Sequence, residues 1–311
     1  MDEQIKDFSK QLAWRPEIVN HDRLEKRTKF ILCGMGGSTL AAGLLKVAEP
    51  KLDLLIHRDY GLPRVPDYFL HESVIILSSY SGNTVEVLDV GREALEFGLH
   101  LAVVTSGGKL LDWAKKNDLP YIVLPSGSQP RMALGYFCKA LAMLLGDSRL
   151  LATLGTTTIS SALLEAAGET LANKLRNKIP VIYSSTLNYP LAYHWKISFN
   201  ETAKVSAFAN AFPELNHNEM QSQFDPNQFS FIFLRDGSHD PRIEDRLDKL
   251  KVLYERAGLG VEVIQITGTT VWEKIFHSVI LAEWTVLHLA RVRQVDPETV
   301  PLIEEFKKSL V

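Results

Sequence analysis

The stretch Val74–Thr84 reads Val-Ile-Ile-Leu-Ser-Ser-Tyr-Ser-Gly-Asn-Thr, and the rest of the chain is interpreted outward from it. Its first four residues are apolar and three of them are β-branched, which predicts a short buried strand. The strand ends in hydroxyl, amide and glycine residues, and Val85–Leu88 then begins a helical pattern. Such a strand-to-helix turn presents backbone N–H groups at the positive end of a helix dipole, which suits an anion such as phosphate. A helix-capping loop without a ligand has the same composition, so both interpretations stay open here.

Short apolar segments alternate with helical patterns along most of the chain. The predicted strands are Lys29–Cys33, Asp53–His57, Val74–Leu77, Leu101–Thr105, Tyr121–Leu124, Pro180–Ser184, Phe229–Leu234 and Gly260–Ile266. The predicted helices include Val85–Phe97, Leu110–Asn117, Tyr189–Ala209, Pro241–Ala257, Val271–Arg293 and Val300–Leu310. Strands that alternate with helices form βαβ units and parallel sheets. We therefore predict an α/β fold of two three-layer αβα domains, each with a mostly parallel sheet flanked by helices, over residues 1–152 and 153–311.

The composition is that of an ordinary globular protein. Of the 311 residues, 46% are hydrophobic and 23% are charged, and the formal net charge is −3. This charge creates no basic field for nucleic acid or an anionic membrane. We expect no nucleic-acid partner, no membrane partner and a cytoplasmic location, since no secretory signal or membrane span is recognised. Cys33 and Cys138 both lie in apolar sequence and are expected to be buried free thiols.

A second glycine-rich turn, Gly34–Ser38, follows the first predicted strand. A dinucleotide-binding motif needs Gly or Ala where Thr39 stands, and an acidic residue near the end of the next strand, whereas Asp53 begins that strand. The glycines nevertheless allow a ligand to approach the backbone, and Ser38 adds a hydroxyl. No Walker motif and no metal-ligand spacing is found in the sequence. Two such turns therefore favour a sugar phosphate, and we expect neither a metal nor a cofactor.

Candidate acid–base residues lie in the second half of the chain. Glu201 lies in a helical, partly apolar pattern, and the segment Phe212–Glu219 reads Phe-Pro-Glu-Leu-Asn-His-Asn-Glu. We expect the two asparagines beside His217 to orient its imidazole for proton transfer. Glu214 and Glu219 compete with Glu201 for the role of base, and a solvated helix cap is the alternative.

Arg131 follows Pro130 at the start of a predicted helix. Its guanidinium could neutralise a phosphate or a developing oxyanion. A surface arginine without a function fits the same pattern.

Together these segments resemble the sugar isomerase (SIS) superfamily, and within it the bifunctional phosphoglucose/phosphomannose isomerases. The resemblance extends over about residues 30–310 and rests on Gly34–Ser38, Ser79–Thr84, Pro130–Tyr136 (Pro-Arg-x-Ala-Leu-Gly-Tyr), Asn200–Lys204 (Asn-Glu-x-Ala-Lys), Phe212–Glu219, Val295–Pro297 and Pro301–Lys307. It implies two SIS-type domains, the first with the phosphate-binding loops and the second with the acid–base residues and the C-terminal helix.

The resemblance also implies roles for individual residues. The substrate phosphate would be held by Gly36, Gly37, Ser38, Ser79, Ser81 and Thr84. Glu201 would be the base that moves a proton between C1 and C2 through a cis-enediolate. His217 would assist ring opening and would reach the site from the partner subunit of a homodimer. Arg131 would stabilise the enediolate charge with Lys307, although the neighbouring Lys308 leaves the choice of lysine open.

The activity implied is reversible, metal-independent isomerisation of glucose 6-phosphate, and of mannose 6-phosphate, to fructose 6-phosphate. One alternative is a non-catalytic SIS sensor of a sugar phosphate. Such regulators carry a DNA-binding motif ahead of one SIS domain, whereas 28 residues precede the first predicted strand here. A third possibility is another SIS sugar-phosphate isomerase, which would share Ser79–Thr84 but not the Phe212–Glu219 segment.

Overall fold

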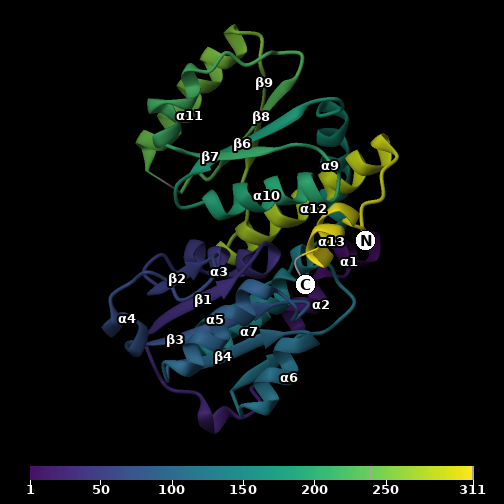
Figure 1. Cartoon of the computed structure of the whole chain (residues 1–311). Coiled ribbons are helices and arrows are strands. Elements are labelled where there is room, and N and C mark those ends of the chain that lie inside the picture. The colour runs from purple at the N-terminus through teal and green to yellow at the C-terminus, as the bar shows by residue number, and fades with distance from the viewer. Residues whose placement is uncertain (239, 310–311) are drawn as a thin grey trace. The chain divides into compact units, whose positions relative to one another are not determined.

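The computed structural model describes residues 1–238 and 240–309, and the chain divides into two compact units (Figure 1). The N-terminal unit comprises residues 7–158, and the C-terminal unit comprises residues 1–6 with the described residues from 159 onward. The domain boundary predicted after residue 152 lies inside helix α8 (Ser148–Thr156). Each unit is described by itself below.

The N-terminal unit contains a sheet of five parallel strands in the order β2-β1-β3-β4-β5. These are β1 (Lys29–Gly34), β2 (Leu54–His57), β3 (Ser73–Ser79), β4 (His100–Thr105) and β5 (Tyr121–Val123). All five predicted strands are confirmed, with ends shifted by one or two residues. Because the strand order reverses direction between β1 and β3, the helices that follow these two strands cover opposite faces of the sheet. Open α/β sheets bind ligands at such a switch point.

Helices cover both faces of this sheet. One group comprises α2 (Phe8–Ala13), α3 (Gly37–Ala48), α7 (Leu134–Leu144) and α8. The other comprises α4 (Asp67–Glu72), α5 (Val85–Glu96) and α6 (Gly108–Lys116), whose apolar residues share a core with those of β1, β3 and β4. Every residue of β3 is buried as a result. Parallel strands covered on both faces have continuous apolar sequences, which explains the run Val74–Leu77.

The C-terminal unit contains four parallel strands in the order β7-β6-β8-β9. These are β6 (Ile179–Ser185), β7 (Phe208–Phe212), β8 (Phe229–Arg235) and β9 (Gly260–Gln265). One layer contains α9 (Ala162–Lys174), α10 (Tyr189–Glu201) and α12 (Val271–Arg293), with α1 (Asp2–Lys6) against α12. On the opposite face lie α11 (Pro241–Arg256) and the 3-10 turns η3 (Glu214–His217) and η4 (Glu219–Gln221) (Figure 1). The remaining described helix is α13 (Pro301–Ser309).

The predicted helix over residues 189–209 is wrong in its second half. Helix α10 ends at Glu201, Lys204 takes a left-handed conformation with φ of 56°, and Phe208–Phe212 forms the edge strand β7. This strand is made by parallel pairing with β6, an interaction between distant segments that a local apolar pattern does not reveal. The helix predicted to end at Leu310 is found as α13, and Leu310 lies outside the described residues.

The core of the C-terminal unit is aromatic on the α11 side. The ring of Tyr183 lies 5.5 Å from that of Phe231 and 5.6 Å from that of Phe233, and Tyr254 of α11 packs against both phenylalanines. Buried aromatic side chains remove a large apolar area from water, and favourable ring contacts add about 0.5–1.5 kcal/mol for each pair. This cluster therefore anchors β6 and β8 to the helix that covers them.

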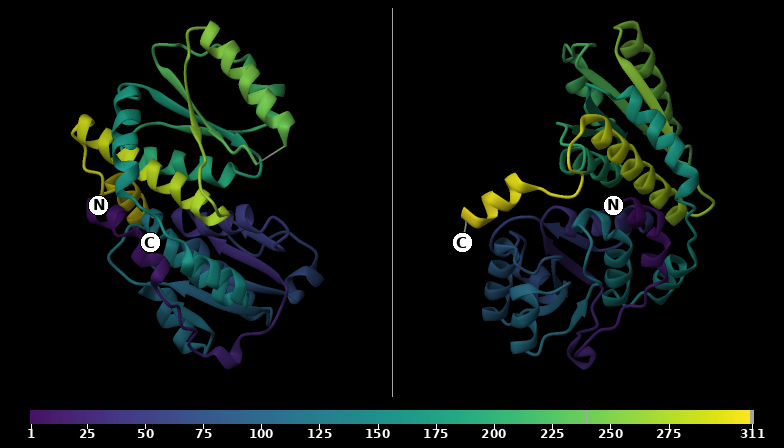
Figure 2. Two further views of the ribbon diagram at one scale, coloured as in Figure 1. Left: turned by 180° about the vertical axis from the view of Figure 1, so that it is seen from behind. Right: turned by 90° about the vertical axis from the view of Figure 1, so that its right-hand side faces the viewer.

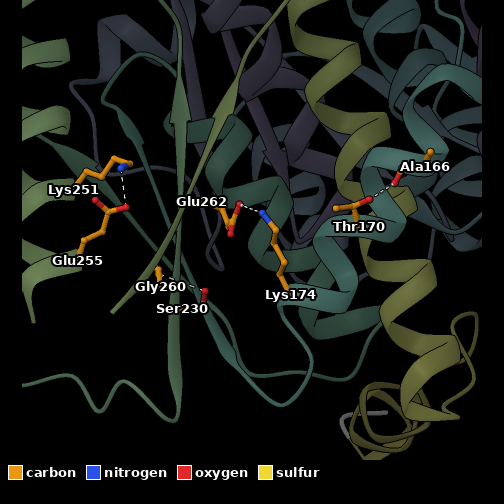
Figure 3. Close-up of polar contacts among 8 residues, drawn as sticks. All are labelled: Ala166, Thr170, Lys174, Ser230, Lys251, Glu255, Gly260 and Glu262. Carbon is orange, nitrogen blue, oxygen red and sulfur yellow. Dashed lines mark hydrogen bonds and ion pairs between the residues drawn. The ribbon is translucent and has the colours of Figure 1, made fainter. Parts of the chain in front are cut away.

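Two polar contacts join β9 to neighbouring elements of the C-terminal unit. Lys174 at the end of α9 pairs with Glu262 of β9 at 2.8 Å, and the Ser230 hydroxyl donates to the Gly260 carbonyl at 3.5 Å (Figure 3). Exposed ion pairs of this kind contribute only about 0–1 kcal/mol. These contacts therefore add little to the free energy of unfolding, which depends mainly on the apolar core of the unit.

Of the described helices, α12 alone has the length and apolar composition of a membrane-spanning segment. However, 72% of its apolar window is buried inside the protein, where it packs against α9 and α10. Such burial is typical of the core helix of a folded domain.

Both cysteines are free and buried, as predicted. Burial raises the pKa of the Cys33 thiol to about 12, and burial likewise raises the pKa of Cys138. We expect a thiol reagent such as DTNB to modify neither cysteine in the native protein at pH 8 and both after denaturation. Because the native state holds these protons more tightly than the unfolded chain, their stabilising contribution is complete below about pH 8.5 and is lost as the pH rises toward 12. Rapid modification of one native thiol would contradict this prediction.

Candidate functional site

In the N-terminal unit, the turns after β1 and β3 lie side by side, since Gly34 is paired with Ser78 in the sheet. The backbone N–H of Tyr80 donates to the Ser38 hydroxyl at 3.1 Å, and the Ser78 hydroxyl donates to the Ser38 carbonyl at 2.9 Å. These bonds fasten the end of β3 to the start of α3. Two turns that are far apart in the sequence thereby form one polar surface.

The hydroxyls of the second turn gather before the first residue of α5. The Ser79 and Thr84 hydroxyl oxygens lie 2.8 Å apart, and the Gly82 N–H donates to the Ser79 hydroxyl at 3.1 Å. Ser81 is exposed, and its hydroxyl accepts from the Asn83 N–H at 3.3 Å. Thr84 occupies the N-cap position of α5, but within the described chain its side chain bonds to Ser79 and does not cap the helix. The first N–H groups of α5 are therefore not satisfied by their N-cap side chain, which suits an anionic ligand.

Two glycines allow these turns to pack closely. A Cβ atom at Gly37 would lie 2.8 Å from the backbone nitrogen of Arg131. Gly82 has a φ of +67°, and a Cβ atom there would lie 1.8 Å from the carbonyl oxygen of Gly107. No side chain fits at either position without moving the backbone, so the glycines are required for packing as well as for access.

Arg131 lies beside the first turn, on the 3-10 turn η2 (Pro130–Met132). Its exposed fraction is 1%, so the interpretation as a surface arginine is wrong. The side-chain amide of Gln11 in α2 donates to the Met132 carbonyl at 2.7 Å and accepts from the Gly135 N–H at 3.0 Å. Gln11 thus fixes the segment that carries Arg131.

No local sequence pattern marks this role of Gln11, because its partners lie more than 120 residues further along the chain. Arg58 is a second residue whose role no sequence motif predicts. It follows β2 at the same edge of the sheet, and its Nε donates to the Thr39 hydroxyl at 3.0 Å. The Thr39 hydroxyl in turn donates to the Gly36 carbonyl at 3.0 Å, so Arg58 braces the first turn.

In the C-terminal unit, Glu201 is the last residue of α10 and is half-buried. The Lys204 ammonium donates to the backbone carbonyls of Glu201 and of Thr299, the latter at 2.6 Å. Free carbonyls at a helix C-terminus attract a cation. Lys204 therefore closes the end of α10 and holds the segment that leads to α13.

The two competing carboxylates have other partners. Glu219 accepts hydrogen bonds from the Tyr183 hydroxyl at 2.6 Å and from the Asn210 amide. Burial and the hydrogen bond to Glu219 raise the pKa of Tyr183, so this phenol stays protonated as the donor. Glu214 is exposed and accepts from Asn218 at 2.9 Å. Both carboxylates serve local structure.

His217 is exposed at the end of η3. The expectation that its neighbouring asparagines orient the ring is wrong, because their side chains bond elsewhere. Asn216 accepts from Arg246 at 3.3 Å, and Asn218 donates to Glu214 at 2.9 Å. Among the described residues, the imidazole has no hydrogen-bond partner in this chain.

Lys307 and Lys308 are both exposed on α13, where Leu302 and Phe306 are also exposed. In the right-hand view of Figure 2, this yellow helix stands away from the rest of its own unit. The structure thus brings Gly36, Gly37, Ser38, Ser79, Ser81, Thr84 and Arg131 together at one edge of one sheet. It places Glu201, His217 and Lys307 on three separate elements of the other unit.

The described part of the chain also contains a cavity that lies apart from the predicted catalytic residues. A cavity of about 540 Å³ in the C-terminal unit is lined by residues that include Tyr189, Tyr193, Lys196, Phe208 and Glu219, and by none of the predicted catalytic residues. Over residues 1–238 and 240–309, no three His, Cys, Asp or Glu side chains are grouped as metal ligands.

Solved structures share this architecture over nearly the whole chain. A hypothetical protein from Thermus thermophilus matches with a TM-score of 0.73 at 17% identity, covering 99% of this chain and 88% of its own. Tagatose-6-phosphate ketose/aldose isomerase from Escherichia coli matches with a TM-score of 0.69 at 14% identity, covering 95% and 93%. At these identities the likeness concerns the fold alone, an α/β fold with two parallel sheets flanked by helices.

Sequence relatives identify the family within that class. A protein-family model described as "Bacterial phospho-glucose isomerase C-terminal SIS domain" matches residues 165–310. The bifunctional phosphoglucose/phosphomannose isomerase of Thermoplasma volcanium is 31% identical over 97% of this chain and 99% of its own length. That of Caldicellulosiruptor bescii is 33% identical over 93% and 91%. This chain belongs to the family of bifunctional phosphoglucose/phosphomannose isomerases and is an isomerase.

A further relative, which has a different name, matches part of this chain in sequence. The D-glucosamine-6-phosphate 4-epimerase of Sulfolobus acidocaldarius is 32% identical over 65% of this chain and 66% of its own length.

Proposed function

We propose that this enzyme interconverts glucose 6-phosphate and fructose 6-phosphate, and that it also converts mannose 6-phosphate to fructose 6-phosphate. The observation that carries the proposal is the pair of hydroxyl-rich turns after β1 and β3, fastened together through Ser38 and Tyr80. Their hydroxyls and the N-termini of α3 and α5 suit the dianionic phosphate of a sugar. The names of the relatives identify the sugar phosphates to be tested first.

In this proposal the N-terminal unit binds the substrate and does not react with it. The phosphate is held by Gly36, Gly37, Ser38, Ser79, Ser81 and Thr84. Binding energy gained at the phosphate, several bonds from the reacting carbons, holds C1 and C2 in position for proton transfer. The serines are ligands in this mechanism and not nucleophiles.

Glu201 is the proposed base. It takes the proton from C2 of the open-chain aldose, and the electron pair of that bond forms a C1–C2 double bond while the C1 carbonyl becomes an oxyanion. Arg131 and Lys307 stabilise this cis-enediolate. Glu201 then returns the proton to C1, and the proton of the C2 hydroxyl moves to O1 as the C2 carbonyl forms. These shifts of protons and electron pairs within the substrate require no external oxidant and no cofactor.

His217 is proposed to assist ring opening by giving a proton to the ring oxygen as the bond between that oxygen and C1 breaks, while the proton of the C1 hydroxyl passes to water. It is also proposed to act in the site of the partner subunit of a homodimer. Its exposure at the end of η3 supports such a role, since a side chain held within its own chain would not reach a second subunit. Imidazole is suited to this transfer because its ordinary pKa lies near neutrality.

The shared histidine predicts complementation between two inactive variants. Glu201→Gln and His217→Asn are each expected to be inactive, and a mixed dimer contains one site with both native residues. Random mixing makes half of the dimers mixed, so about a quarter of wild-type activity should return on refolding the two together. Activity that stays at the level of the separate variants would show that His217 acts within its own subunit.

The overall proposal is tested with a substrate panel in the presence of EDTA. We expect glucose 6-phosphate and mannose 6-phosphate both to yield fructose 6-phosphate at rates unaffected by the chelator. Binding of both sugars by folded protein without turnover would overturn the proposal in favour of a sensor.

The epimerase relative makes 4-epimerisation of glucosamine 6-phosphate a second candidate. NMR analysis of the products separates the two reactions, because the isomerase moves a carbonyl between C1 and C2 whereas an epimerase inverts C4. Turnover of glucosamine 6-phosphate alone would support this second candidate.

A further inference from the structure

A buried polar cluster joins α10 to α12 in the C-terminal unit, where the two helices pack together (Figure 1). The Nε2 atom of His194 lies 3.1 Å from Oε1 of Glu283, and the Ser198 hydroxyl donates to the same oxygen at 2.8 Å. The exposed fractions of His194 and Ser198 are 0%, and that of Glu283 is 1%. One carboxylate of α12 thus contacts two successive turns of α10.

Burying this polar cluster between two helices costs folding free energy. His194 Nδ1, His194 Nε2 and Glu283 Oε2 are buried and have no hydrogen-bond partner among the described residues, so the imidazole meets Glu283 as a close polar contact at 3.1 Å and not through a hydrogen bond. Burying ionisable groups costs free energy that their mutual attraction often does not recover, and apolar side chains of similar volume commonly stabilise a core as well or better. Stability alone therefore does not explain the cluster.

The geometry that the cluster fixes is that of the helix carrying Glu201. His194, Ser198 and Glu201 are spaced i, i+4 and i+7, so they lie along one stripe of α10. Glu201 is the next residue of this stripe, one turn after Ser198. A helix that slips by one residue rotates by about 100° and moves by about 1.5 Å, which would point the Glu201 carboxylate elsewhere.

We propose that Glu283 is a positioning residue for the isomerase reaction: through His194 and Ser198 it sets the rotation and axial position of α10, and hence the direction of the Glu201 carboxylate. This inference rests on the proposed function, because it takes Glu201 as the base. Lys204 holds the end of the same helix through the Glu201 carbonyl. Proton transfer from carbon requires close alignment, and a displacement of about 1 Å can lower the rate about 100-fold.

The test uses three variants of the full chain. His194→Leu with Glu283→Leu replaces the whole pair by apolar side chains, which avoids leaving one buried partner without the other. Glu283→Gln is the conservative variant, since its amide oxygen can take the place of Oε1, where it accepts from the Ser198 hydroxyl and faces His194 Nε2. Ser278→Ala is the matched control: it removes the bond from the Trp195 indole to Ser278 at 3.1 Å, another buried contact between α10 and α12 that lies off the stripe.

Circular dichroism and thermal melting first establish that each variant is folded. We expect the double variant to lower kcat about 100-fold while KM changes less than about threefold, because the substrate phosphate is bound by the other unit. Glu283→Gln should keep kcat within about fivefold of the wild type. Ser278→Ala should lower the melting temperature and leave kcat unchanged.

Three results would overturn the inference. They are a wild-type kcat in the folded double variant, a fall in kcat in Glu283→Gln as large as that in the double variant, or an equal fall in kcat in Ser278→Ala. Each variant is measured on whichever sugar phosphate the wild type converts in the substrate panel, so a wrong substrate assignment is detected separately. If Glu201→Gln remains active, the base is misassigned and the positioning role proposed for Glu283 is overturned with it.

Discussion

Glu201→Gln is expected to lower kcat about 10³- to 10⁴-fold while leaving KM for glucose 6-phosphate nearly unchanged. The amide has the shape of the carboxylate but cannot accept a proton from carbon. Substrate affinity should persist because the proposed phosphate ligands all lie in the N-terminal unit. Steady-state kinetics with a coupled assay for fructose 6-phosphate measure both constants.

Glu214→Gln provides the matched control. It makes the same chemical change in an exposed carboxylate that bonds to Asn218, and its kcat should remain within about twofold of the wild type. Near-normal turnover in Glu201→Gln would reassign the base, and Glu219 would then be tested next. Exchange of the substrate C2 proton with D₂O gives an independent measure, since it reports proton abstraction directly and should be lost in Glu201→Gln alone.

Gly82→Ala is expected to raise KM and to lower kcat/KM about 10²- to 10⁴-fold. A Cβ atom at this position would lie 1.8 Å from the Gly107 carbonyl oxygen, so the turn between Ser79 and Thr84 has to move. The Gly82 N–H would then no longer donate to the Ser79 hydroxyl. Hydrogen bonds to a charged group contribute about 1.5–3 kcal/mol each, and losing two at the phosphate gives the range stated.

Gly98→Ala separates this effect from backbone strain. Gly98 also has a positive φ, +65°, but no described heavy atom lies within 4 Å of a Cβ placed there. Alanine in the left-handed region costs about 1–2 kcal/mol at either position. We therefore expect Gly98→Ala to lower the melting temperature and to leave kcat/KM unchanged. Similar kinetic losses in both variants would mean that strain, and not the displaced turn, explains the result.

Much of the fold could be predicted because its signals are local. The run Val74–Leu77 is apolar because helices cover both faces of β3, and the glycines and hydroxyls after it mark the turn. Predicted and observed bounds agree to the residue for α12, whose Thr270 caps its N-terminus through a hydrogen bond from the Glu273 N–H at 3.2 Å. Patterns of 3.6-residue period and capping residues depend only on neighbours in the sequence.

Features that depend on distant partners were not predicted. Phe208–Phe212 forms a strand because β6 is available to pair with it, whereas the sequence pattern predicts that the preceding helix continues to Ala209 and predicts no strand there. Gln11 fixes the segment of Arg131 across more than 120 residues. The asparagines beside His217 bond to Arg246 and Glu214 and leave the ring exposed.

The sequence by itself determined the α/β class, the two hydroxyl- and glycine-rich turns and the resemblance that led to the isomerase family. It did so because strand and helix periodicity, turn glycines and short motifs are properties of contiguous residues. Only the tertiary structure decided that Ser38 bonds to the end of β3, that Gly37 lies against Arg131, and that Glu283 meets the stripe of α10 that ends in Glu201. Each of these contacts joins segments separated by some 40 to 95 residues, and their geometry is set by how the strands and helices pack.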